Sequence, residues 1–194
     1  MKFRAMIVIA AAAMLSACGI NSVPTAEEAA KARWGDVQIQ YQRRANLIPN
    51  LVATVKAAGA QEKDILVQVT QARASANQVQ VSRDDLTDPA KMAAFQRAQA
   101  GVTLSLQRLQ EAYPELKSQG NYTTLMSQLE GTENRISIAL NDYNGAVQAY
   151  NTRIRTFPDA IGAKIFYGAK PMVPFQATTP GADTAPSVNF GNAS

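Results

Sequence analysis

The sequence predicts an all-α fold, an antiparallel four-helix bundle with long first and last helices. Apolar residues recur with a seven-residue spacing over long stretches, which is typical of helices packed side by side. Prolines and capping residues divide the chain into four helical segments with short connections. Of the 194 residues, 46% are hydrophobic and 18% are charged, which suffices for one core. In an alternative fold the first two helices form one rod, because the apolar pattern nearly continues through Gly59.

The first helix is expected to begin at Thr25-Ala26-Glu27-Glu28, which has the pattern of a capping box. Pro49 removes the backbone hydrogen bond to the Ala45 carbonyl and should kink this helix. A weak apolar pattern around residues 57–61 predicts a turn there. Two rows of residues spaced by seven are expected to face the core: Trp34, Tyr41, Ile48 and Val55 in one, and Ala30, Val37, Arg44, Leu51 and Ala58 in the other.

The middle pair of helices is predicted from about 61–80 and from Pro89 onward. The intervening residues 81–87 are expected to form a polar loop, and Asp88 should cap the third helix ahead of a proline at its first position. The inward positions expected on the second helix are Ile65, Leu66, Val69, Ala72 and Ala76. Those expected on the third helix are Met92, Phe95, Val102, Leu106, Leu109 and Tyr113.

The last helix has the clearest period. Pro114 should start a short turn, Asn121 should cap the helix, and Pro158 should end it. Its two rows are Tyr122, Leu129, Ile136, Tyr143, Tyr150 and Phe157, and Met126, Glu133, Leu140, Val147 and Ile154. A strict 3.5-residue period predicts left-handed packing against neighbouring helices. The bundle is therefore expected over 26–157, with residues 158–176 folding back over it and a disordered tail over 177–194.

Charged residues in the apolar rows predict a polar layer. Arg44 and Glu133 interrupt the rows of the first and last helices, and antiparallel packing places them at similar heights. The same reasoning brings Arg73 and Gln96 to that height, with the Glu133 carboxylate within salt-bridge distance of Arg44 or Arg73. A buried layer that fixes the helix register is the favoured interpretation, and a ligand site is the alternative.

The N-terminal residues 1–17 have the pattern of a secretory signal. Lys2 and Arg4 precede an apolar run over 5–17, whose 13 residues span about 20 Å as a helix, short of the roughly 30 Å core of a bilayer. The next feature is Leu15-Ser16-Ala17-Cys18, which matches the lipobox of bacterial lipoproteins. That match implies cleavage before Cys18 and a lipid on its sulfur.

The expected location follows from this anchor. The chain should be held at a bacterial membrane by lipid on Cys18 and should face outside the cytoplasm, joined to the bundle by a tether over 18–25. If the cell has two membranes, Gly19 after the cysteine mildly favours the outer one, because an aspartate there is usual for retention at the inner membrane.

Several sequence runs together resemble the LemA family: QRRANLIPNLVATVK (42–56), QAR (71–73), YPELKSQGNY (113–122), TENRISIALNDYNGAVQAYN (132–151) and FP (157–158). The resemblance covers most of residues 30–175. It implies an antiparallel helical bundle held at a bacterial membrane by an N-terminal anchor, and it points to no catalytic residues. The family usually has Gly-Tyr and a histidine in the stretch matching 57–62, where this chain has Ala57, Ala58 and Gln61.

The composition argues against catalysis. The sequence contains no histidine and one cysteine, so it lacks the histidine of a catalytic triad or of a typical zinc or di-iron site. We expect no enzyme activity, no metal and no cofactor. The net charge of +4 comes from dispersed basic residues, so no nucleic-acid partner is expected.

Two functions fit the sequence. The first is a membrane-anchored interaction or scaffold module of the cell envelope, with an envelope protein as partner. The second is a small-ligand or lipid-binding bundle that uses the polar layer. Because the two long helices outreach the middle pair, the surface around Trp34 and Tyr150 is predicted to be less covered and to bind the partner.

Overall fold

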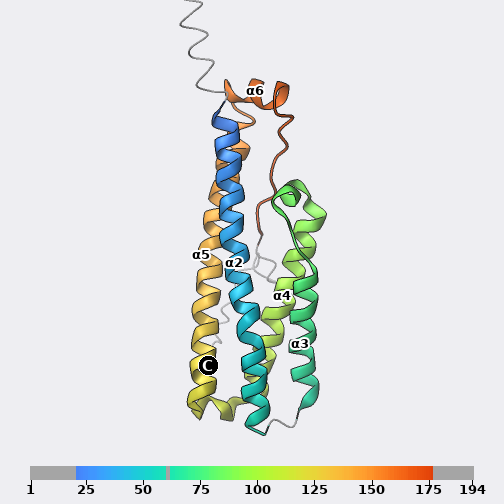
Figure 1. Cartoon of the computed structure of the whole chain (residues 1–194), viewed down its shortest axis with the longest axis vertical. Coiled ribbons are helices and arrows are strands. Elements are labelled where there is room, and N and C mark those ends of the chain that lie inside the picture. Colours follow the sequence, from blue (N-terminus) through green and yellow to red (C-terminus); the bar gives the residue numbers. More distant parts are fainter. Residues whose placement is uncertain (1–20, 60–61, 177–194) are drawn as a thin grey trace, which may run out of the picture.

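The computed structural model describes residues 21–59 and 62–176, and within them the regular secondary structure is helical (Figure 1). The all-α prediction is therefore confirmed for this part of the chain. The α-helices are α2 (Ser22–Ala57), α3 (Lys63–Gln78), α4 (Pro89–Ala112), α5 (Gly120–Arg153) and α6 (Asp159–Ile165). The expected signal over 1–17, Cys18 and the tail over 177–194 lie outside the described residues.

The two long helices, α2 and α5, lie side by side over most of their length (Figure 1). They run antiparallel, because Trp34 near the start of α2 contacts Tyr143 near the end of α5, while Arg44 further along α2 pairs with Glu133. The shorter helices α3 and α4 form a second pair beside α2 and do not reach its N-terminal end (Figure 1).

The start of α2 differs from the prediction. The helix begins at Ser22, so the expected capping box at Thr25 is wrong, and so is a tether that reaches residue 25. The Thr25 hydroxyl instead donates to the Asn21 carbonyl, at 2.7 Å, from inside the first turn. Pro24 is tolerated in this turn because the first backbone N–H groups of a helix lack intrahelical partners.

The junction between α2 and α3 excludes the continuous rod. α2 ends at Ala57, and the Gly59 N–H donates to the Lys56 carbonyl at 3.1 Å. Gly59 has a φ of 86°, in the left-handed region that glycine adopts without a steric penalty. The predicted turn is thus present, and the alternative of one rod is wrong.

The connection between α3 and α4 is less polar than predicted. Val81 and Leu86 within it are fully buried, and residues Arg83–Thr87 form a 3₁₀ turn. Asp88 caps α4 as expected, because its carboxylate accepts from the backbone N–H groups of Ala90 and Lys91 at 2.9 and 3.2 Å.

The start of α5 also differs from the prediction by a residue or two. The helix begins at Gly120, so Asn121 is not its cap. The first row of α5 is buried from Tyr122 to Tyr150 as predicted. Phe157 is the exception: it is 83% exposed, because the helix ends at Arg153 and the heptad register stops with it.

The buried side chains form two hydrophobic clusters along the long axis. One cluster contains Trp34, Tyr41 and Phe95, and the other contains Ile48, Val102 and Leu129. Arg44 lies between them on α2. The predicted polar layer therefore interrupts the core rather than lining its edge.

Candidate functional site

The guanidinium of Arg44 is the centre of the polar layer. Its Nη1 lies 2.6 Å from Glu133 Oε1 on α5 and donates to Thr103 Oγ1 at 3.0 Å. Its Nη2 donates to the side-chain oxygen of Gln99 on α4 at 2.6 Å and to the Gln99 carbonyl at 3.3 Å. Its Cζ also lies 5.0 Å from the ring centroid of Tyr41, within cation–π range. The buried cation on α2 is thus hydrogen-bonded to two other helices, α4 and α5, at one level.

Arg73 adjoins this layer in an unexpected way. Its Nε donates to the Ala45 carbonyl at 2.8 Å. That carbonyl has no helical partner, because the residue four positions on is Pro49, which carries no N–H. Arg73 on α3 therefore supplies the hydrogen bond that Pro49 removes from α2. Of the two arginines predicted to pair with Glu133, the one that does so is Arg44.

Gln96 is buried, but the amide that contacts Arg44 belongs to Gln99, one turn further along α4. The inclusion of Gln96 in the Arg44 contacts is therefore wrong. Matching helices by height is accurate to about one turn, and a turn is 3.6 residues. The signal that could have corrected the prediction was Gln99, a second glutamine three residues after Gln96 on the same helix.

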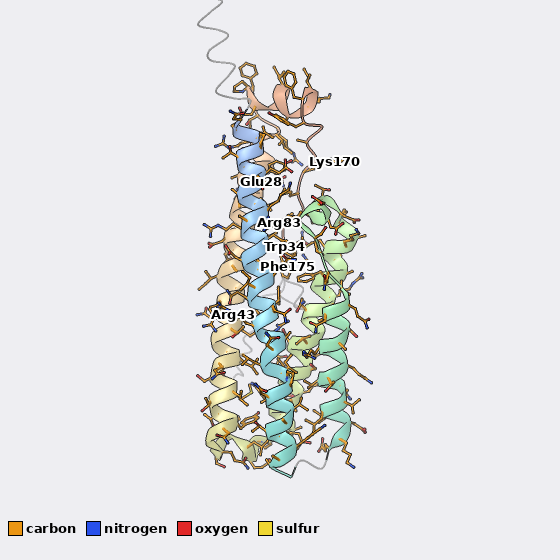
Figure 2. The ribbon with its side chains drawn as sticks, in the orientation of Figure 1. Glu28, Trp34, Arg43, Arg83, Lys170 and Phe175 are labelled. Atoms are coloured by element: carbon orange, nitrogen blue, oxygen red, sulfur yellow. The ribbon has the colours of Figure 1, made fainter. Side chains whose placement is uncertain are left out.

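A groove of about 670 Å³ opens beside the polar layer, between α2 and the α3–α4 pair. Three arginines line it: Arg44 at the buried level, the half-buried Arg73, and the exposed Arg83, which Figure 2 labels beside α2. Its lining contains no aspartate or glutamate. The lining amides are those of Gln38, Gln42, Asn77, Gln80 and Gln99.

The electrostatics of the groove favour an anion. Within residues 21–59 and 62–176, neither Arg73 nor Arg83 pairs with a carboxylate. Burial raises the pKa of the Tyr41 phenol well above its usual value, against a smaller lowering by the Arg44 charge, so its hydroxyl stays protonated at neutral pH. The groove therefore presents uncompensated guanidinium groups beside apolar side chains of α2 and α4.

A repeated Tyr-Asn pair on α5 binds the segment that follows α6. The Asn144 side chain makes two hydrogen bonds with the Phe175 backbone, at 2.9 and 2.8 Å, and Asn151 makes the equivalent pair with Met172, at 2.8 and 2.9 Å. The Tyr143 and Tyr150 hydroxyls donate to backbone carbonyls of the same segment at 2.9 and 3.1 Å.

The spacing of the two Tyr-Asn pairs along α5 matches the spacing of their partners along the extended segment. Seven helical residues rise about 10.5 Å and three extended residues about 10 Å, so two pairs one heptad apart meet positions 175 and 172 of an extended chain. The segment 158–176 therefore folds back as predicted, although its partners on α5 are asparagine amides rather than apolar side chains alone. Met172 is buried, and Phe175 packs against the cluster that contains Trp34.

The predicted partner surface at Trp34 and Tyr150 is wrong, because these side chains are 0% and 2% exposed. Trp34 Nε1 donates to the Val81 carbonyl at 2.9 Å, and the returning segment covers Tyr150. The exposed apolar groups of this end lie instead on residues 157–167, of which the heptad rows contain Phe157 alone, and as a core position.

The part of the chain that the structure describes carries neither a metal-binding cluster nor a helix able to span a membrane. There, no three His, Cys, Asp or Glu side chains are grouped so that they could hold a metal ion. None of the helices in that part combines the length and apolar character that crossing a membrane requires.

The fold and site define an all-helical protein with a buried charged layer, a basic groove and a returning C-terminal segment. The sequence model of the LemA family matches residues 33–190. This chain therefore belongs to the LemA family, which confirms the resemblance found in its sequence runs. No match was found among curated proteins.

Proposed function

We propose that this LemA family protein is a lipoprotein of the bacterial cell envelope, with an antiparallel four-helix bundle that serves as an interaction module. The observation that carries the proposal is the short distance along the chain between Cys18 and α2. The helix begins at Ser22, so three peptide units join Cys18 to Asn21 and span at most about 11 Å. A lipid on Cys18 would thus hold a rigid helix close to the bilayer, outside the cytoplasm.

The interaction role is proposed on the basis of what the helices offer at their surface. The polar layer satisfies its own buried cation, and exposed apolar side chains such as Val67, Leu104 and Ile138 lie singly on the outer faces. A non-obligate protein interface is about as apolar as the rest of a protein surface, so such faces can contact an envelope protein without an apolar patch of their own.

The anchor can be tested by replacing Cys18 with serine. Cys18→Ser removes the thiol to which lipid would be attached, so we expect complete loss of metabolic palmitate labelling and accumulation of an uncleaved precursor. Gel mobility and labelling in growing cells measure both effects. Ser16→Ala, which leaves a small residue in the lipobox, is the matched control and should stay labelled. Labelling that persists in Cys18→Ser would exclude the lipoprotein.

A second candidate function is the binding of a small anionic ligand in the arginine groove. It is supported by the three arginines of the lining and the absence of acidic residues among the lining residues. A carboxylate or phosphate would meet Arg73 and Arg83, and an attached apolar chain would meet side chains such as Ile48 and Val102. The chemistry is therefore that of an anionic amphiphile.

Arg83→Gln tests this candidate, because Arg83 is exposed and its removal should leave the fold unchanged. We expect the variant to weaken the binding of decanoate severalfold, since one of the guanidinium partners is lost. Calorimetric titration measures the effect, with inorganic phosphate as a second probe that lacks the apolar chain. Arg97→Gln, an exposed arginine outside the groove, should bind as the wild type does. Equal affinity in all three proteins would exclude the groove as the site.

A further inference from the structure

Exposed apolar side chains concentrate in one short part of the molecule. Among the described residues, nine large hydrophobic side chains are exposed, and five of them fall within residues 157–167. These five are Phe157 (83%), Ile161 (54%), Ile165 (69%), Phe166 (67%) and Tyr167 (40%). The other four are scattered over α2, α3, α4 and α5. A clustered apolar surface of this kind marks a contact site, whereas single exposed side chains do not.

The cluster lies at the end of the molecule where α2 begins. Helix α6 lies across the N-terminal end of α2, beyond the reach of α3 and α4 (Figure 1). Its Ala163 is buried against the core, and Ile161 and Ile165, four residues apart, lie on another face of the helix. Figure 2 shows side chains of this end projecting away from the bundle.

This end is held in place rather than loosely attached. The Asn144 and Asn151 amides bind the backbone of the segment after α6, and the Ala169 N–H donates to the Ala163 carbonyl at 3.0 Å. Arg153 pairs with Asp159 across the start of α6 at 3.7 Å. The apolar cluster is therefore presented by a fixed support.

The charges around the cluster are mostly positive. Arg155, Lys164 and Lys170 are exposed, Asp159 is engaged by Arg153, and Glu27 and Glu28 of α2 are engaged by Lys31. Cationic side chains next to a membrane are attracted to anionic lipid headgroups. Aromatic side chains are favoured at the same depth, because they are apolar and tolerate the polar interface.

We propose that the α6 end, residues 157–167, inserts into the outer part of the bilayer to which the lipid is attached. This inference rests on the proposed anchor, because Cys18 is three residues from Asn21 and so would bring the bilayer to this end of α2. The lipid supplies attachment, and the α6 end supplies a second contact that fixes the bundle upright. A lipid anchor holds the chain at the bilayer without fixing how the bundle is oriented, so this second contact would set its orientation.

Tryptophan fluorescence in vesicles tests the proposal. Phe166→Trp is purified as the full lipidated chain and reconstituted into vesicles of phosphatidylethanolamine with a minor fraction of phosphatidylglycerol, with bromine on the acyl chains. We expect the new tryptophan to be blue-shifted and quenched severalfold more strongly than Leu104→Trp, a half-exposed position on the side of α4. The buried Trp34 gives the same background in both proteins.

The outcomes separate this proposal from the anchor itself. Equal quenching of the two variants, with Cys18 shown by mass spectrometry to be acylated, would overturn insertion and leave the lipoprotein intact. An unacylated Cys18 would instead contradict the anchor. As a second variant, Ile165→Asp combined with Phe166→Trp should be quenched less than Phe166→Trp alone, and an unchanged far-UV circular dichroism spectrum would show that the fold is kept. Quenching equal to that of Phe166→Trp alone would also count against insertion.

Discussion

Replacing Trp34 with alanine should lower the free energy of unfolding by about 3–5 kcal/mol, the range for loss of a large buried aromatic side chain. The ring is fully buried, and its centroid lies 5.3 Å from that of Phe95 and 5.1 Å from that of Tyr143. Truncation would leave a cavity where α2, α4 and α5 meet. It would also remove the bond from Nε1 to the Val81 carbonyl, which ties the α3–α4 connection to α2.

Chemical denaturation followed by circular dichroism measures this effect, since Trp34 is the single tryptophan of the chain. Trp34→Phe is the matched control, because it keeps an aromatic ring and loses the N–H. The Val81 carbonyl would still accept from Gln38 Nε2 at 3.0 Å, so we expect this control to lose far less, on the order of 1 kcal/mol for one hydrogen bond. Equal losses in the two variants would mean that the hydrogen bond, not the packing, dominates.

The heptad pattern predicted the helices and most of the core, because long helices bury their apolar rows whatever else they touch. Tyr122, Leu129, Ile136, Tyr143 and Tyr150 are all buried, and Asp88 caps α4 as its sequence context predicts. The Arg44–Glu133 contact also follows from the pattern. When the ends of two antiparallel helices are known, they determine which residues of the two helices lie at the same height.

The features that the sequence did not reveal depend on contacts between distant segments. From the sequence, Asn144 and Asn151 are candidates to bond tyrosine hydroxyls or a facing helix, and their actual role becomes visible when an extended segment is placed beside them. That segment covers Tyr150, so the expectation of an exposed surface there failed. The predicted start of α2 was wrong for a different reason. Ser22 and Thr25 are both plausible helix starts, and the propensities of a few residues do not decide between them.

Replacing Glu133 with alanine should destabilise the protein by about 3 kcal/mol, the lower part of the range for breaking a buried ion pair. The asymmetry of the pair determines this value. The Arg44 side chain is 3% exposed, whereas that of Glu133 is 39% exposed. Without Glu133, a buried cation would keep only the neutral oxygens of Thr103 and Gln99. Glu130→Ala, an exposed glutamate on the same helix, should change the stability by less than about 0.5 kcal/mol.

A second substitution separates the charge from the packing. Arg44→Met removes the buried cation, so in the Glu133→Ala background no unpaired charge would remain in the core. We therefore expect the double variant to be more stable than Glu133→Ala alone, because apolar replacement of a buried pair is often neutral or stabilising. Denaturation of the four proteins of this cycle gives the coupling free energy. A double variant less stable than either single variant would mean that Arg44 contributes mainly through its contacts with Gln99 and Tyr41, and that its charge matters little.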